Sequence, residues 1–127
     1  DVYKRQEIEF MTGEKDIKTG VKKLIDEYHI PFICATMGKN GSMAFFDGHI
    51  VEAAPFLRDD TVETTGAGDT FCACLLHDVL EHGINDRKDD DVKKMLTFAN
   101  AAASLITTRK GALRVMPEKG EVEAAIK

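Results

Sequence analysis

The stretch that most restricts the fold of this chain is VETTGAGDTF, residues 62–71, where a strand-like segment runs directly into a helix-like one. The first four residues are rich in β-branched side chains, which favour a strand. From Ala67 the apolar residues recur at the spacing of a helix that Gly83 would end. They are Phe71, Leu75, Leu76, Val79 and Leu80. A strand that passes through glycines into a helix is typical of α/β folds, in which ligands bind beyond the carboxyl ends of the strands.

Upstream of this junction the sequence predicts a helix, a buried strand and a hairpin. Apolar residues fall on one face of a helix over 17–28, and Asp16 is placed to cap its N-terminus. The run FICATMG after Pro31 is too short for a helix and is typical of a buried strand in a parallel sheet. Two further runs, SMAFFD and HIVEAA, flank Asp47-Gly48, a pair that favours a two-residue hairpin turn.

Downstream of the junction the sequence predicts two more helices. One runs from about Val92 to Thr107, preceded by Asp89–Asp91, whose carboxylates complement the positive end of its dipole. A short terminal helix lies within EKGEVEAAIK. Strands and helices of this kind along one chain predict an α/β protein.

Composition excludes several classes of protein. At 127 residues the chain has the size of one domain, and its net charge of -5 argues against a nucleic-acid partner. No apolar run approaches the roughly 18 residues needed to span a bilayer, so we expect no membrane partner. The three cysteines fit reduced, intracellular thiols, and we expect Cys72 and Cys74 to act as small buried hydrophobic residues.

The first six residues, DVYKRQ, do not continue any pattern that follows them. They read as the translation of a transposase sequencing adapter. We therefore interpret residues 1–6 as a sequencing or assembly scar, leave them out of the fold prediction, and assign residues 7–127 to the natural protein. A genuine polar N-terminus is the alternative.

The Gly-Ala-Gly-Asp tetrapeptide, residues 66–69, can be interpreted as a catalytic site or as a purely structural turn. Glycines let a ligand approach the backbone, and the free N–H groups that begin a helix bind anions such as phosphate. Asp69 would then accept the proton of a hydroxyl nucleophile during phosphoryl transfer. A tight turn with a capped helix explains the same residues without chemistry. A second glycine-rich junction, TMGKNG at 36–41, follows the predicted buried strand.

The wider sequence decides between these interpretations. VETTGAGDTF closely resembles the signature D-T-x-G-A-G-D-x-F of the ribokinase/PfkB family of carbohydrate kinases. ATMGKNGSMAFFDG resembles the family's nucleotide strand and hairpin, TFANAAASLITTRKGA its adenine-side helix and loop, and EIEFMTG the segment after its N-x-x-E motif. The resemblance covers nearly all of residues 7–127. It implies the C-terminal portion of a ribokinase-like three-layer α/β/α sandwich with a β-hairpin, because family members run to about twice this length.

By position, the resemblance implies a catalytic and nucleotide site. Asp69 would be the general base that activates the sugar hydroxyl. The backbone of Gly66, Ala67 and Gly68 would form the anion hole for the transferring phosphate. The segment 36–41 would line the ATP phosphates and ribose, and Asn100 would lie by the adenine. The nucleotide-binding residues are thus Thr36, Gly38, Gly41, Asn100 and Ala103.

The resemblance also implies metal sites. Glu7 matches a glutamate linked to Mg²⁺ and phosphate, although Lys4 stands where the family motif has asparagine. Family members often bind a monovalent cation such as K⁺ beside the anion hole, largely through backbone carbonyls. The matching positions are Glu63, Thr65, Ile106, Arg109, Gly111 and Val115. Glu63 replaces the aspartate of the signature, and Val115 offers no side-chain oxygen, so this cation site departs from the family pattern.

The activity implied is phosphorylation of a sugar hydroxyl by ATP with Mg²⁺. Fructokinase is our first expectation, with kinases of 2-keto-3-deoxygluconate, ribose or a nucleoside as alternatives, because the sugar-binding residues lie upstream of this chain. We expect a cytoplasmic, homodimeric parent and an inactive 127-residue chain. A nucleotide-binding fragment without turnover and a purely structural α/β domain are the rival hypotheses.

Overall fold

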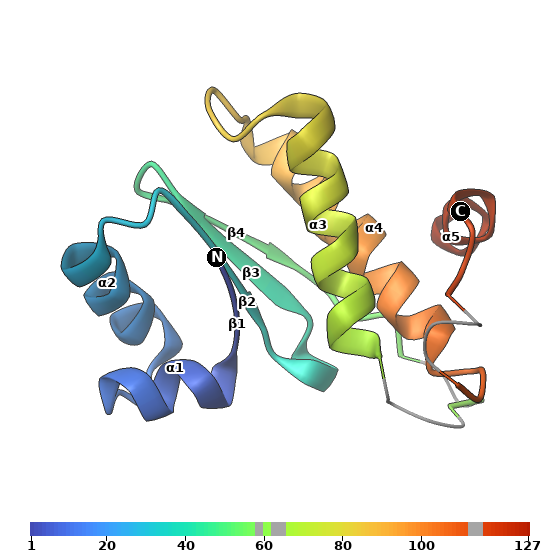
Figure 1. The fold of residues 1–127 in the computed structure, drawn as a ribbon, viewed down its shortest axis with the longest axis horizontal. Helices are drawn as coiled ribbons and strands as arrows, with labels where there is room; N and C mark the ends of the chain where they lie inside the picture. Colours follow the sequence, from blue (N-terminus) through green and yellow to red (C-terminus); the bar gives the residue numbers. More distant parts are fainter. Residues whose placement is uncertain (58–59, 62–65, 112–115) are drawn as a thin grey trace.

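The computed structural model describes residues 1–57, 60–61, 66–111 and 116–127 and contains a four-stranded sheet in the order β1-β2-β3-β4 (Figure 1). Strand β1 (Val2–Lys4) pairs in parallel with β2 (Phe32–Thr36). Strands β3 (Ser42–Phe46) and β4 (His49–Ala53) then pair antiparallel to their neighbours. The predicted strand and hairpin are confirmed, but the sheet is mixed rather than parallel. The predicted strand at 62–65 lies outside the described residues.

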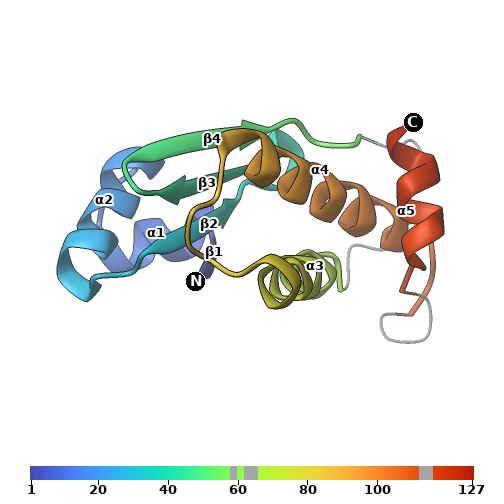
Figure 2. The same cartoon turned by 90° about the horizontal axis from the view of Figure 1, so that it is seen from above.

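Helices cover both faces of this sheet, which makes the predicted three layers (Figure 2). Helices α1 (Arg5–Thr12) and α2 (Ile17–Tyr28) lie on one face. Helices α3 (Ala67–His82) and α4 (Asp89–Ile106) lie on the other, and α5 (Lys119–Ile126) packs against α4. Within the described residues, no helix combines the length and the apolar character that crossing a bilayer requires.

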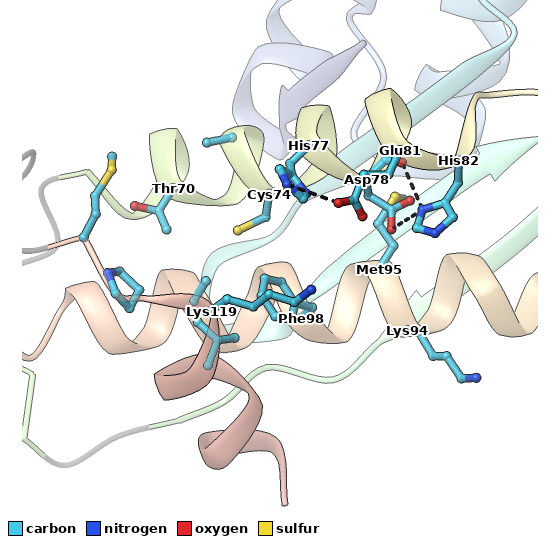
Figure 3. Close-up of a pocket in the computed structure, with 15 residues that line it drawn as sticks. Thr70, Cys74, His77, Asp78, Glu81, His82, Lys94, Met95, Phe98 and Lys119 are labelled. Carbon is cyan, nitrogen blue, oxygen red and sulfur yellow. Dashed lines mark hydrogen bonds and ion pairs between the residues drawn. The ribbon is translucent and has the colours of Figure 1, made fainter.

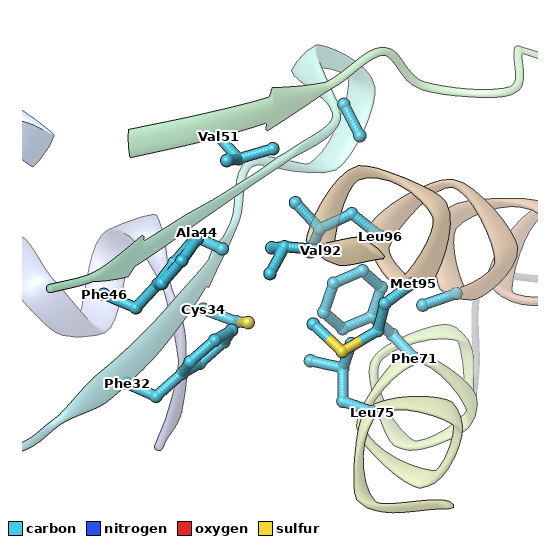
Figure 4. Packing of buried hydrophobic residues seen from close by; sticks show 12 residues of the cluster. Phe32, Cys34, Ala44, Phe46, Val51, Phe71, Leu75, Val92, Met95 and Leu96 are labelled. Carbon is cyan, nitrogen blue, oxygen red and sulfur yellow. The ribbon is translucent and has the colours of Figure 1, made fainter. Parts of the chain in front are cut away.

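Two hydrophobic clusters explain why β2 reads as an unbroken apolar run. Alternate side chains point to opposite faces of a strand, and both faces here are buried. The side facing α3 and α4 carries Phe32 and Cys34, which pack with Phe71 and Leu75 (Figure 4). The side facing α1 and α2 carries Ile33 and Ala35. Burial raises the pKa of the Cys34 thiol to about 12.

The turn between β3 and β4 has the geometry that its sequence predicts. Asp47 and Gly48 have φ values of 47° and 75°, so both central residues are left-handed, as a type I′ hairpin turn requires. Asp16 likewise caps α2 as predicted, because its carboxylate accepts a hydrogen bond from the Thr19 N–H at 3.1 Å. The Thr19 hydroxyl, which donates to the same carboxylate at 2.7 Å, and this backbone bond both lower the pKa of Asp16.

The structure corrects the exclusion of the first six residues from the fold. Val2–Lys4 form β1, and the Cys34 N–H donates to the Asp1 carbonyl at 2.8 Å. Three apolar or amphipathic residues suffice for a strand when a neighbouring strand offers its backbone. That residues 1–6 are a scar stays a hypothesis.

Two smaller predictions are also corrected. Helix α4 begins at Asp89 rather than Val92, so the three aspartates form its first turn, where negative charge is favourable. Cys72 and Cys74 are half-buried rather than buried, because only one side of α3 packs against the sheet and α4.

Close packing of α1 against α2 depends on Gly20. A Cβ atom there would lie 2.6 Å from Ile8 Cγ2, closer than real contacts allow. We expect Gly20→Ala to lower the free energy of unfolding by about 1–2 kcal/mol through overpacking. Gly120→Ala is the matched control in α5: the site is open, so helix propensity should stabilise that variant slightly. Urea unfolding of both variants measures the difference, and equal effects would contradict the close contact.

Candidate nucleotide and phosphate site

The pairing of the strands brings both glycine-rich junctions to one end of the sheet. Lys4, Thr36, Ser42 and Ala53 are successive neighbours across the four strands. The turn at 37–41 leaves the sheet at this row. Helix α3 begins there too, because a Cβ on Gly68 would lie 3.8 Å from the Lys4 Cε. The two junctions therefore face the same region, as the α/β pattern predicts.

The N-terminus of α3 has no side-chain cap among the described residues. Gly66, with φ 83° and ψ -2°, occupies the N-cap position and has no side chain that could cap the helix. The first intrahelical bond runs from the Thr70 N–H to the Gly66 carbonyl at 2.9 Å. The N–H groups of Ala67, Gly68 and Asp69 precede it, so they have no acceptor within the helix. Three amides and the helix dipole thus converge on one point, an arrangement suited to phosphate.

Other helices of the chain close their own N-termini with carboxylates. Glu7 accepts from the Lys4 N–H at 2.8 Å in α1, and Glu121 accepts from the Glu118 N–H at 2.7 Å in α5. This contact and the Arg109 side chain lower the pKa of Glu121. Helix α3 carries Asp69 in its first turn, but Asp69 is exposed and makes no hydrogen bond or ion pair with any described residue. Its carboxylate is available for a ligand.

The second junction is a tight turn built on glycine. Gly41 N–H donates to the Gly38 carbonyl at 3.2 Å, and the Met37 N–H donates to the Gly41 carbonyl at 2.9 Å. Gly41, with φ 86°, lies so close to β4 that an added Cβ would be 2.1 Å from the Ala53 oxygen. Gly38, with φ 55°, has nothing within 4 Å of that position. Gly41 is therefore required by its packing against β4, whereas Gly38 leaves the backbone of the turn accessible.

Asn100 connects α4 to the same end of the sheet. Its Nδ2 donates to the carbonyls of Ala54 at 3.1 Å and Ala53 at 3.4 Å. One turn later Ser104 Oγ donates to the Phe56 carbonyl at 2.9 Å. These contacts hold the segment after β4 along α4, a role that the sequence did not predict. Ala103, also predicted to bind nucleotide, packs its side chain against the core.

The predicted monovalent-cation positions are described only in part. Glu63, Thr65 and Val115 lie outside the described residues. Ile106 ends α4 with a fully buried side chain, and its carbonyl accepts from the Arg109 N–H at 3.2 Å. Gly111 follows with φ 98°.

One contact of the described residues places the end of α4 near Thr61. Thr61 Oγ1 lies 3.5 Å from Thr107 Oγ1, directly after α4. Arg109 forms an ion pair with Glu121 at 2.5 Å. For Mg²⁺, the described residues contain no group of three or more histidine, cysteine or acidic side chains placed to bind a metal. Glu7 itself caps α1, and its predicted link to Mg²⁺ stays a prediction.

A separate cavity of about 450 Å³ lies between α3, α4 and α5 (Figure 3). Its lining is mainly apolar and includes Cys74, Phe98 and Val122. Thr70 lies at one end, and its buried hydroxyl has no hydrogen-bond partner among the described residues. Helical spacing places Phe98 on the side of α4 opposite Asn100, so this cavity is distinct from the predicted nucleotide site.

Comparison with known proteins agrees with this arrangement. A family model described as pfkB family carbohydrate kinase matches residues 3–119. The fructokinase of Klebsiella pneumoniae is 32% identical over 123 residues, which cover 95% of this chain and 39% of that protein. Fructokinase-1 of Zea mays is 28% identical over 116 residues, covering 91% and 36% respectively.

Solved structures share the fold. The fructokinase of Vibrio cholerae O395, in its fructose, ADP and calcium ion bound form, superimposes with a TM-score of 0.84 at 25% identity, over 99% of this chain and 40% of that one. The ribokinase of Arabidopsis thaliana, complexed with ribose and ATP, gives 0.79 at 27% identity, over 100% and 41%. The chain thus has a partial ribokinase-like α/β fold and spans about two fifths of these relatives. Because the family model matches nearly its whole length, the chain belongs to the pfkB family of carbohydrate kinases.

Proposed function

We propose that this chain is the nucleotide-binding and proton-accepting part of a fructokinase-like sugar kinase. The observation that carries the proposal is the N-terminus of α3, where amides without an acceptor in the helix lie beside an Asp69 carboxylate that has no partner among the described residues. An anion site alone would gain nothing from a neighbouring carboxylate, because like charges repel. The pair makes sense when one group binds a phosphoryl oxygen and the other accepts a proton.

In the proposed reaction a sugar hydroxyl oxygen attacks the γ-phosphorus of ATP. A new oxygen–phosphorus bond forms, the bond from the γ-phosphorus to the bridging oxygen breaks, and ADP leaves with that electron pair. Asp69 takes the hydroxyl proton, and the amides of Gly66–Gly68 stabilise the charge on the transferring group. Mg²⁺ would enter bound to ATP and neutralise part of the phosphate charge.

The nucleotide would extend from α3 towards Asn100. The turn at 38–41 lies between these points, and Gly38 leaves room for a close approach to the backbone. The Asn100 amide donates to the carbonyls of Ala54 and Ala53 at the end of β4, so its contribution to adenine binding would include holding this wall of the site in place. A monovalent cation such as K⁺ would lie by the loop that holds Ile106, Arg109 and Gly111.

Fructose is the substrate that the names of the relatives support. The Klebsiella and maize relatives are both fructokinases, and the Vibrio cholerae structure contains fructose and ADP. The ribose-bound ribokinase keeps ribose as an alternative acceptor, and the earlier alternatives, 2-keto-3-deoxygluconate and nucleosides, stay open. The complete kinase would be a cytoplasmic homodimer.

A second candidate is nucleotide binding without turnover by the 127-residue chain itself. The observation that favours it is length, because about three fifths of the fold of these relatives lies outside this chain. Sugar contacts made by that portion would be absent from the 127-residue chain. Nucleotide binding is therefore the activity to test first.

Calorimetric titration of the folded, monodisperse chain with Mg-ATP is expected to show saturable binding. Gly68→Val should weaken it by about tenfold or more, because a branched side chain would block access to the amides. Gly120→Val is the matched control, since Gly120 holds the same second position in α5 and lies in open space. Equal affinities of the two variants would remove the α3 N-terminus from the site. A folded chain that binds no Mg-ATP would contradict the proposed nucleotide site.

A further inference from the structure

The cavity between α3, α4 and α5 belongs neither to the core beneath the sheet nor to the predicted nucleotide site. Buried residues through which α3 and α4 meet the sheet, such as Phe71 and Leu96, do not line it. Its walls come from three helices, with Cys74 on α3, Phe98 on α4 and Val122 on α5 (Figure 3). At about 450 Å³ it has the volume of a typical small-molecule site.

The Thr70 hydroxyl gives this cavity an unused hydrogen-bonding group. Thr70 is only 5% exposed, and its Oγ1 has no hydrogen-bond partner among the described residues. The Thr70 backbone is satisfied, because its N–H donates to the Gly66 carbonyl at 2.9 Å. A buried hydroxyl without a partner is destabilising, and such groups are rare in native proteins. A ligand that hydrogen-bonds to Thr70 would remove this cost.

The charged side chains at the cavity leave two lysines without a counter-ion. Each of the two acidic lining residues, Asp78 and Glu81, already contacts a basic side chain of α3 or of the loop after it. Lys94 and Lys119 also line the cavity, and neither forms an ion pair with another described residue. Figure 3 shows the Lys119 side chain reaching towards Phe98. The unpaired charge is therefore positive, which favours an anionic ligand.

The apolar walls suit an aromatic ring. Met95, Phe98 and Met116 all line the cavity. Thioether sulfurs and phenyl rings make favourable contacts with aromatic groups. A cavity of about 150 Å³ is enough for one benzene ring, so this cavity has room for a pair of fused rings with a polar substituent.

We propose that this cavity binds a small aromatic carboxylate. The rings would lie against Phe98 and the methionine side chains, and the carboxylate would accept a hydrogen bond from the Thr70 hydroxyl and face the Lys119 ammonium group. The proposal rests on the cavity and its lining, and it does not depend on the chemistry of Asp69 or on nucleotide binding.

Titration with 2-naphthoate tests this proposal, and 2-naphthamide serves as a neutral probe of the same shape. The chain contains no tryptophan, so the fluorescence of the naphthalene ring reports binding directly. The folded, monodisperse chain is expected to bind 2-naphthoate saturably, with a dissociation constant of about 1 mM or tighter for a ligand of this size. 2-Naphthamide should bind at least about fivefold more weakly, because it cannot make a charge-assisted hydrogen bond as an acceptor.

Two pairs of variants locate the bound probe. Ala73 is exposed and lines the cavity, so Ala73→Phe should block its mouth and weaken binding of 2-naphthoate by about tenfold or more. Ala124→Phe, at an exposed position of α5 outside the lining, should leave binding unchanged. Lys119→Gln should abolish the preference for 2-naphthoate over 2-naphthamide. Lys22→Gln, the same change of charge at an exposed position of α2, should preserve it.

Thr70→Val keeps the shape of the side chain and removes only the hydroxyl. The affinity for 2-naphthoate should fall by about tenfold, because a hydrogen bond to a charged acceptor is lost. Without ligand, the urea midpoint of unfolding should be unchanged or higher, because the hydroxyl has no partner to lose. A lower midpoint would show that the chain itself already satisfies this hydroxyl, and would overturn its assignment to a ligand.

Three results would overturn the proposed site. They are no saturable binding of 2-naphthoate by the folded chain, equal affinities for the two probes, and loss of 2-naphthoate binding in Gly68→Val. In the last case the probe would occupy the N-terminus of α3 rather than the cavity. Binding of 2-naphthoate by a chain that does not bind Mg-ATP would keep the cavity site and remove the proposed function.

Discussion

In a kinase made by fusing the upstream three fifths of the Klebsiella pneumoniae fructokinase to this chain, Asp69→Asn is expected to lower kcat by about 10²–10⁴-fold, which is the usual contribution of a positioned general base. Asparagine has nearly the same shape but cannot take the hydroxyl proton. The affinity for Mg-ATP should be almost unchanged, because the amides of Gly66–Gly68 remain in place. Loss of kcat with an unchanged dissociation constant is therefore the signature of a base rather than of a binding residue.

The control for this variant is Asp86→Asn. Asp86 is exposed in the loop between α3 and α4 and has φ 57°, a conformation that asparagine tolerates as well as aspartate does. Asp86→Asn should leave kcat, Mg-ATP affinity and the unfolding midpoint unchanged. Steady-state ADP release measures kcat, and calorimetry measures binding. An Asp69→Asn enzyme that is as active as the parent would show that the proton goes elsewhere.

Gly41→Ala is expected to lower the free energy of unfolding by about 3 kcal/mol or more, the largest stability effect that we predict. The added Cβ would meet the Ala53 carbonyl oxygen at 2.1 Å, and a backbone atom cannot rotate away as a flexible side chain can. In addition, φ 86° with ψ -141° is a backbone conformation reached almost only by glycine. Steric and conformational costs therefore add at one position.

Gly38→Ala separates the two costs. Gly38 has a left-handed φ of 55° but open space around it, so only the conformational cost of about 1 kcal/mol applies. Urea unfolding of the two variants should differ by about 2 kcal/mol. If they proved equally destabilised, the contact between Gly41 and β4 would not be the reason that glycine is needed there.

Local signals in the sequence were enough for most of the fold. The Asp47-Gly48 turn, the Asp16 cap and the glycine that ends α3 each act within a few residues of themselves, so a sequence shows them directly. The glycine junction at residues 66–69 is equally local. It predicted a helix that begins at Ala67 with Asp69 in its first turn, and α3 begins there.

Features that depend on contacts between different elements were not predicted. Arg87 has a side chain only 6% exposed, paired with Asp78 and donating to the Gly83 carbonyl at 3.0 Å, but alone it reads as a loop arginine. Asn100 meets carbonyls that lie 46 and 47 residues away along the chain. Strand β1 forms because β2 offers it a backbone partner. Its three residues are too few to show the alternation of apolar and polar side chains that marks a strand in a sequence.

The connectivity of the sheet also has a kinetic consequence. The β3–β4 hairpin closes through a two-residue turn, so its formation costs little chain entropy and belongs to the microsecond range. The parallel pair of β1 and β2 encloses both α1 and α2, and its ends can meet only after that long loop has been ordered. The hairpin is thus a natural nucleus, and β1 joins last. Strand β1, at an edge of the sheet, is then also expected to detach first when the protein unfolds, and its amides to exchange fastest among those of the four described strands.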